Sequence, residues 1–237
     1  VPAVVTTRAT IMRRAPLETF TLEVALILGE VGLTLSQLES WAAPVSVPPI
    51  AEQPGAFGRI YPEPYGVTLI QSAWNYPIMQ LFCPLVGALA AGNTAILRPA
   101  STSPNCARVA AEISARAFEP ELVTCLVGPS SLTNDVIAAP VDYAFFTGSP
   151  KVGRTIMELC AKHLVPVTLE LGGKSPTIVD ESADLKLAAR KIAWGKLCNA
   201  GQICLSVDHV YAHRNIIDEL VAHLGSEFDA MLGPDAD

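Results

Sequence analysis

Apolar residues recur at helical spacing near the start of the chain, in residues 17–28 (LETFTLEVALIL) and 35–41 (LSQLESW). This period predicts two helices. Prolines then crowd into residues 43–64, at Pro44, Pro48, Pro49, Pro54, Pro62 and Pro64. Because proline cannot donate a backbone hydrogen bond, residues 43–64 are predicted to form an extended connector with at most short edge strands.

From Gly66 onward, short runs typical of strands alternate with runs of helical period. The strand-like runs are 66–73, 94–99, 124–128, 142–148, 166–173 and 176–180. The helical runs are 77–92, 103–118 and 149–164, and a further long helix opens near 182–184. This alternation predicts an α/β fold whose parallel sheet is joined by right-handed crossovers.

Composition and charge narrow the class of protein. Half of the 237 residues are hydrophobic and only 16% are charged, which excludes a disordered chain and suits a sheet covered on both faces. The formal net charge of -7 makes nucleic acid an unexpected partner. Residues 66–97 carry no charge, but polar residues and prolines interrupt them, so strand, turn, helix and strand are favoured over a transmembrane span.

Six cysteines, an even number, would suit a disulfide framework: Cys83, Cys106, Cys125, Cys160, Cys198 and Cys204. The chain is long and shows no secretory signal, so reduced thiols and a cytoplasmic location are expected instead. No C-x-x-C pair occurs, and His209 and His213 lack the glutamate of an H-E-x-x-H helix. We therefore expect no metal site.

Ligands of open parallel sheets bind beyond the carboxyl ends of the strands, which points to the turns after Ala73, Leu97 and Thr147. No G-x-G-x-x-G fingerprint is present. The run FFTGSPKVG instead places Gly148 and Ser149 between a strand and a helix that contains Gly153. Glycine allows close backbone approach, and Ser149 can cap the helix and donate to a phosphate. An ordinary strand-to-helix turn is the alternative.

Three residues could carry chemistry, each with a plain structural alternative. Glu170 lies on a strand that we expect to be buried, where it would become a general base, or else it pairs with Lys174 or faces solvent from an edge strand. Cys204 follows Gly201 at an expected helix start, where the thiol is a nucleophile or a small apolar filler. Asn75 could donate to a developing oxyanion or merely complete a turn.

Taken together, five ordered strings resemble the motif series of the NAD(P)-dependent aldehyde dehydrogenases. They are WNYP (74–77), LVGALAAGNTAILRP (85–99), FFTGSPKVG (145–153), KHLVPVTLELGGKSP (162–176) and WGKLCNAGQIC (194–204). The strings IYPEPYGVTLI and KHLVPVTLELGGKSP are most similar to the class 3 and fatty-aldehyde branch.

The resemblance implies that an aliphatic or fatty aldehyde is oxidised to its carboxylic acid. Cys204 would attack the aldehyde to form a thiohemiacetal and then a thioester. Its backbone N–H and the Asn75 side chain would be the oxyanion donors, and Glu170 would activate the hydrolytic water. Acylating transfer to coenzyme A shares the cysteine but usually does without the glutamate, so the presence of Glu170 argues against it.

The resemblance also implies NAD or NADP as cofactor. Residues from Gly148 and Ser149 to Gly153 would face the pyrophosphate, and Leu171 and Gly172 would lie beside the nicotinamide. Trp74, Arg98 and Ser101 would lie near the rest of the cofactor. The family commonly has Lys-Pro-Ser-Glu where this chain has residues 98–101, Arg-Pro-Ala-Ser. A cation without the carboxylate is expected to tolerate the 2′-phosphate of NADP.

Family members continue well beyond the cysteine, so the sequence is expected to be truncated at both ends. Residues 1–171 would form a doubly wound NAD(P)-binding domain, and residues 172–237 would begin an incomplete α/β catalytic domain. The homodimer of the family is in doubt here because its dimer-forming strand is missing from these residues. The alternative function is a catalytically silent remnant that at most binds nucleotide or a full-length relative.

Overall fold

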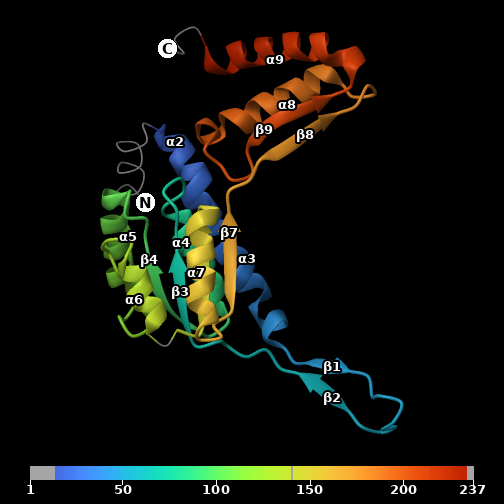
Figure 1. The fold of residues 1–237 in the computed structure, drawn as a ribbon. Coiled ribbons are helices and arrows are strands. Elements are labelled where there is room, and N and C mark those ends of the chain that lie inside the picture. Colours follow the sequence, from blue (N-terminus) through green and yellow to red (C-terminus); the bar gives the residue numbers. More distant parts are fainter. Residues whose placement is uncertain (1–13, 140, 234–237) are drawn as a thin grey trace. The chain divides into compact units, whose positions relative to one another are not determined.

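The computed structural model describes residues 14–139 and 141–233 (Figure 1). The chain divides into two compact units, residues 1–170 and residues 171–237. Each unit has its own sheet and its own apolar core, so the two are described one at a time.

The first unit begins with a continuous helical segment. It consists of α2 (Pro16–Thr19), a π-helical turn η1 (Phe20–Val24) and α3 (Ala25–Ala42). Pro16 stands in the first turn, where its missing N–H is not needed, and Ala43, which precedes Pro44, is already extended. The two predicted helices are therefore parts of one helical segment, and α3 packs along α4 (Met79–Ala90).

This helical segment, Pro16–Ala42, is long and apolar enough to cross a membrane by length and composition alone. Only 22% of its most apolar window is buried. The same test is passed by the core helices of soluble proteins and by signal sequences, so it is weak evidence. The helical segment contacts α4, so part of its apolar surface packs in the core of the first unit.

The proline-rich connector contains a short antiparallel pair, β1 (Val45–Val47) and β2 (Gly58–Ile60). The two strands form a separate two-stranded sheet, in which Val45 pairs with Ile60 and Val47 with Gly58. Most of their residues are exposed, which agrees with prolines that leave too few donors for a larger sheet.

A five-stranded sheet forms the centre of the first unit. Its strands are β3 (Val67–Gln71), β4 (Thr94–Arg98), β5 (Val123–Cys125), β6 (Tyr143–Gly148) and β7 (Val167–Leu171). Their order is β5-β4-β3-β6-β7, and β3 pairs in parallel with both β4 and β6. The predicted α/β fold with a parallel sheet is confirmed.

Helices cover the sheet on both faces. The N-terminal helical segment, α4 and α5 (Pro104–Ala117) pack against β3, β4 and β5 in one core cluster that includes Ile70, Leu81 and Leu97. Further along the chain, α7 (Pro150–Ala161) contacts β6 and α6 (Leu132–Ala138). Figure 1 shows α7 in front of the sheet and α3 behind it. The uncharged run 66–97 is thus strand, helix and strand, as predicted.

The second unit is a smaller β-α-β-α arrangement. It contains β8 (Ser175–Val179), α8 (Leu185–Leu197), a 3-10 turn η2 (Cys198–Gly201), β9 (Val207–Ala212), a second 3-10 turn η3 (Arg214–Ile216) and α9 (Ile217–Leu232). The strands β8 and β9 pair in parallel, and α8 packs on α9. The core is correspondingly small, with Val179, Ala189, Ile192, Ile216 and Leu220 as its buried members.

Replacing two glycines of the first unit with alanine should change the free energy of unfolding in opposite directions. Gly66 has a φ of +123°, and a Cβ there would overlap the Asp142 carboxylate, with Cγ only 2.9 Å away. That carboxylate accepts the Val67 N–H at 2.7 Å, so it cannot move without breaking the bond. We expect Gly66→Ala to lower the free energy of unfolding by about 2 kcal/mol or more.

Gly29, in the middle of α3, is the matched control because a Cβ there meets nothing within 4 Å. Gly29→Ala should raise the free energy of unfolding by about 0.5–1 kcal/mol. Urea unfolding of both variants, followed by circular dichroism, measures the two changes. Equal effects of the two substitutions would contradict the assigned backbone conformations.

Candidate active site

The carboxyl edge of the five-stranded sheet gathers the first group of predicted site residues. From β3 the chain moves outward through β4 to β5, and it then returns to the other side of β3 with β6. The turns after β3 and β6 therefore flank the point where the direction of winding changes. Open α/β sheets bind their ligands at such a point.

The turn after β6 is built as a helix cap. The Val152 N–H donates to Ser149 Oγ at 3.3 Å, and the Gly153 N–H donates to the Ser149 carbonyl at 2.9 Å. A Cβ on Gly148 would overlap the Phe146 ring, so a larger residue there would require that ring to move. The predicted cap at Ser149 is confirmed, and its helix, α7, begins at this edge of the sheet with its N–H groups toward the strand end.

The turn after β3 carries Trp74 and Asn75. Trp74 is 44% exposed, whereas Asn75 is half-buried. The buried Gln80 side chain clamps this turn, because its Oε1 accepts the Ala73 N–H at 2.9 Å and its Nε2 donates to Asn75 Oδ1 at 3.2 Å. With its oxygen engaged in this way, the Asn75 carboxamide is oriented by Gln80. In this side chain only Nδ2 is a hydrogen-bond donor, so it is the atom that the proposed oxyanion role would need.

A buried carboxylate holds the start of α4, directly after this turn. Glu23 is fully buried, and its Oε2 accepts the N–H groups of Ile78 at 2.9 Å and Met79 at 3.2 Å. The Arg14 guanidinium lies 3.6 Å from Glu23 Oε1 and over the Tyr76 ring, 4.9 Å from its centroid. The helical segment therefore caps α4 and braces the Asn75 turn.

Beyond β4, a cavity of about 290 Å³ opens at the same edge of the sheet. Its lining consists of Pro99, Ser101, Pro104, Ala107, Val127, Gly128 and Pro129. Among these, Ser101 is the residue that was expected to lie near the cofactor. The segment 127–129 was missed by sequence reasoning, although its Gly-Pro step after a strand was a visible turn signal.

Arg98 does not face this cavity as a free cation. Its side chain is 2% exposed, and its guanidinium donates to the main-chain carbonyls of Leu126, Gly128 and Pro129. Burial lowers the pKa of this guanidinium. The expectation that Arg98 offers its charge to a 2′-phosphate is therefore wrong, because its donors are already used on carbonyl oxygens inside the protein.

Glu170 is exposed, so the expectation of a buried carboxylate is also wrong. The reason is its place on β7, which is an edge strand of the five-stranded sheet. Lys174, the proposed ion-pair partner, lies 3.1 Å from Asp208 instead. Hydrogen bonding from Lys174 lowers the pKa of the Asp208 carboxyl. The alternative in which Glu170 faces solvent from an edge strand is the one observed.

Cys204 lies in a turn of the second unit and is exposed. The expected helix start is wrong, because α8 ends at Leu197 and the chain then takes three left-handed residues, Asn199, Ala200 and Gly201, with φ of 51°, 53° and 75°. Side chains fix this run: Asn199 Nδ2 donates to the Gln202 carbonyl at 3.1 Å, and Gln202 Nε2 to the Asn199 carbonyl at 3.0 Å. The bend therefore presents Cys204 in the turn that leads into β9.

Gly173 allows a second segment to approach this turn. A Cβ on Gly173 would lie 2.6 Å from the Cys204 carbonyl oxygen, which is far closer than real Cβ contacts. The neighbouring Gly172 is exposed and meets nothing within 4 Å, and Leu171 is half-buried. The two glycines of the ELGG string thus have different roles, and Gly173 is the one whose missing side chain the cysteine turn requires.

The other cysteines are less accessible. All six are free thiols in the described part of the chain, and Cys204 alone among them is exposed. Burial raises the pKa of both Cys83 and Cys125 to about 11. Near neutral pH these two thiols therefore hold very little thiolate, so they are poor nucleophiles.

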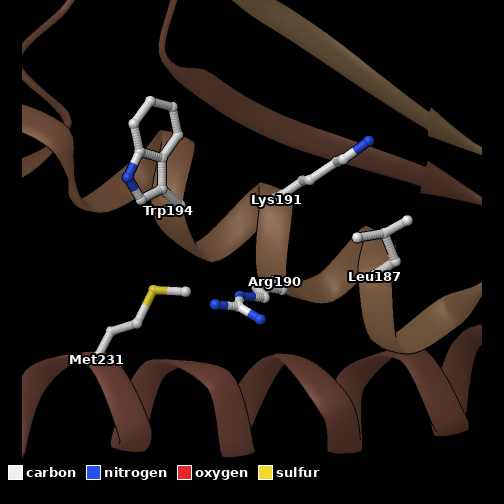
Figure 2. A pocket seen from close by; sticks show the side chains of 5 residues that line it. All are labelled: Leu187, Arg190, Lys191, Trp194 and Met231. Atoms are coloured by element: carbon white, nitrogen blue, oxygen red, sulfur yellow. The ribbon is translucent and has the colours of Figure 1, made fainter.

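Sequence reasoning did not anticipate a cleft of about 470 Å³ between α8 and α9 (Figure 2). Leu187, Arg190, Lys191 and Trp194 of α8 and Met231 of α9 line it. Figure 2 shows Met231 rising from α9 toward α8. Leu187 and Trp194, seven residues apart, share a face of α8, and Trp194 is 65% exposed. The seven-residue spacing of Leu187 and Trp194 was the sequence signal that could have predicted an apolar face on this helix.

Comparisons with known proteins agree on one family. The sequence profile described as the aldehyde dehydrogenase family matches residues 14–237. The 4,4'-diaponeurosporen-aldehyde dehydrogenase of Staphylococcus aureus is 38% identical over 216 residues, which is 91% of this chain and 47% of that protein. The dimeric, NADP-preferring aldehyde dehydrogenase of Canis lupus familiaris is 38% identical over 90% of this chain and 47% of its own length.

A solved structure agrees with these relatives. The substrate-bound state of Staphylococcus aureus AldH superposes with a TM-score of 0.94 at 35% identity, covering 98% of this chain and 51% of that one. The chain spans about half the length of the curated relatives that it matches.

The two glycines of the ELGG string provide a test of the cysteine turn. We expect Gly173→Ala to change the rate at which iodoacetamide labels Cys204 at pH 8 by at least about threefold, because the added Cβ must displace the Cys204 backbone. Gly172→Ala should leave the rate unchanged, since its Cβ meets open space.

Peptide mass spectrometry follows each cysteine separately. Cys83 and Cys125, whose pKa is about 11, should remain unlabelled while Cys204 reacts. If Cys204 is labelled at the same rate in the two glycine variants, the assigned contact between Gly173 and the Cys204 carbonyl is wrong.

Proposed function

Because the chain belongs to the aldehyde dehydrogenase family, we propose that it oxidises an aldehyde to the carboxylic acid with NAD or NADP, through a covalent intermediate on Cys204. The observation that carries this proposal is the exposed Cys204 thiol, held in a rigid turn by three left-handed residues. A thiol in such a place is accessible to a small carbonyl compound, whereas the other five are buried or half-buried.

The first unit supports cofactor binding. The capped N-terminus of α7 beside Ser149 suits a pyrophosphate, and the cavity beside Ser101 suits an adenosine group. When bound, NAD(P) supplies the hydride acceptor for the oxidation. Gly148 would let the cofactor approach the backbone closely, and Trp74, Leu171 and Gly172 would be nearby contacts by their positions in the family motifs.

In the proposed reaction, the Cys204 thiolate attacks the carbonyl carbon, and a C–S bond forms while the carbonyl oxygen becomes an oxyanion. By their positions in the family motifs, the Cys204 N–H and the Asn75 carboxamide would be the donors to that oxygen. Loss of hydride from the same carbon gives a thioester. Glu170 accepts a proton from water, which then attacks the thioester, and the acid leaves as the C–S bond breaks and the thiol is restored.

For the substrate we propose an aliphatic or fatty aldehyde. The sequence resembles the fatty-aldehyde branch most closely in residues 60–70 and 162–176. The Staphylococcus aureus relative acts, by its name, on diaponeurosporen-aldehyde. An apolar aldehyde is the common element of these two observations.

A second function, nucleotide binding without turnover, is favoured by a different observation. The cavity beside Ser101 and the capped α7 both lie within residues 1–170, so neither needs Cys204 or the second unit. The same unit contains its own buried core.

Turnover by the purified chain separates the two functions. We expect reduction of NAD or NADP, followed at 340 nm, to depend on added aldehyde and to fall by a factor of at least about 1,000 in Cys204→Ala, because the covalent step is lost. Cys198→Ala is the matched control and should retain activity. If there is no turnover while NAD still raises the melting temperature, the second function holds.

Cofactor preference should depend on Ser101. We propose that NADP is tolerated because no carboxylate stands at this position to repel its 2′-phosphate. Ser101→Glu should raise the dissociation constant of NADP by about tenfold and leave that of NAD nearly unchanged, whereas the uncharged Ser101→Gln should affect both alike. Fluorescence titration with the reduced cofactors measures these dissociation constants for the unmodified chain and both variants. Strict NAD preference in the unmodified chain would contradict the proposal.

A further inference from the structure

We propose that Arg98 is a positioning residue for the adenosine half of the cofactor. Its buried guanidinium ties the segment 126–129 to the end of β4 and so forms one wall of the cavity beside Ser101. The inference rests on the proposed cofactor use. In this role Arg98 acts through the cavity wall and does not itself contact the cofactor.

Three hydrogen bonds of the Arg98 guanidinium are directed to the segment 126–129. Its Nη2 donates to the Pro129 carbonyl at 2.8 Å and the Gly128 carbonyl at 3.4 Å, and its Nη1 donates to the Leu126 carbonyl. Gly128 and Pro129 line the cavity, and Pro99, the residue after Arg98, lines it as well. One side chain therefore sets the spacing between two walls of the same cavity.

A second link ties this clamp into the sheet and α6. Arg98 Nε lies 3.5 Å from Thr133 Oγ1, and Thr133 Oγ1 in turn donates to Gln71 Oε1 at 2.9 Å. Gln71, the last residue of β3, is paired in register with Arg98. The segment 126–129 is thus fastened to both central strands through side chains that are buried or half-buried.

Arginine is suited to this task in a way that lysine is not. The planar guanidinium offers several N–H donors in a fixed fork, so one group can serve three carbonyls at once. A lysine ammonium is a point charge with freely rotating donors, and it could not span them. Within the described residues, no carboxylate forms an ion pair with Arg98, so carbonyl dipoles are what compensates its buried charge.

The clamp predicts a distinctive pattern of cofactor affinities. Both NAD and NADP contain the adenosine group, and the Arg98 charge is directed into the protein. Loss of the clamp should therefore weaken the binding of the two cofactors by the same factor. If Arg98 instead contacted the 2′-phosphate directly, its loss would weaken the binding of NADP selectively.

The experiment compares Arg98→Met and Arg98→Lys in the full 237-residue chain. Arg116→Met is the matched control, because it removes one positive charge from the exposed last turn of α5. Dissociation constants are measured by calorimetry for NAD, NADP, AMP and nicotinamide mononucleotide. We expect both Arg98 variants to raise the values for NAD, NADP and AMP together, by on the order of tenfold. Nicotinamide mononucleotide and the control should show no change.

Hydrogen exchange of the same proteins is the second measurement. Amides of residues 126–131 should exchange faster in the Arg98 variants while those of β3 and β6 keep their protection. Selective loss of NADP affinity, or unchanged exchange at 126–131, would overturn the proposal. If the Arg98 variants fail to fold, Thr133→Val, which removes the hydroxyl that links Arg98 to Gln71 and leaves the carbonyl contacts of Arg98 in place, should show the same pattern at smaller amplitude. The absence of that pattern would overturn the proposal equally.

An unmodified chain that binds none of NAD, NADP and AMP would refute the proposed cofactor use. The exchange comparison would still decide whether Arg98 holds the segment 126–129, so the two failures are distinguishable.

Discussion

The pairing of β3 between β4 and β6 is the constraint on which the candidate cofactor site depends. Parallel strands require crossovers. The chain winds from β3 to β4 and β5 and then crosses back to β6, which brings the carboxyl ends of β3, β4 and β6 to a common edge. The cavity beside Ser101, the capped helix α7 and the Asn75 turn all lie at the ends of these strands. If β3 were shifted by one residue in register, Gln71 would no longer face Arg98, and the link through Thr133 would be lost.

Two buried charges hold this edge in complementary ways. Glu23 accepts hydrogen bonds from the first N–H groups of α4, which have no acceptor within the helix. Arg98 supplies donors to the carbonyls of Leu126, Gly128 and Pro129. In both places the backbone leaves polar groups without partners at the end of an element, and a charged side chain from a distant segment satisfies them. Burying a charge is costly unless nearby polar groups compensate it, so these contacts favour one arrangement of the segments. The two contacts therefore hold the Asn75 turn and the segment 126–129 in position.

In the second unit, the backbone conformation places one exposed thiol, that of Cys204, in a defined turn. Three consecutive left-handed residues stop α8 and turn the chain toward β9, and the Asn199 and Gln202 side chains fix that bend. Left-handed backbone at Asn199 and Ala200 is strained, and strain of this kind is found where function constrains the chain. Gly173 then allows the ELGG segment to pass against the Cys204 carbonyl. The local geometry of Cys204 therefore depends on backbone conformation more than on a helix dipole.

Four features could be predicted from the amino-acid sequence: the α/β class, the alternation of strands and helices from residue 66 onward, the cap at Ser149 and the family. These follow from periodicity, turn residues and ordered motifs, which are local properties of the chain. Other features became visible only in the folded chain: Arg98 turns inward, Glu170 lies exposed on an edge strand, and Gln80 and Glu23 brace the Asn75 turn. Local patterns could not predict the two buried charges, because their partners are far away along the chain. Glu23 meets residues 55 and 56 positions later, and Arg98 meets carbonyls about 30 positions later. The direction in which a charged side chain points is set by partners that no local pattern contains.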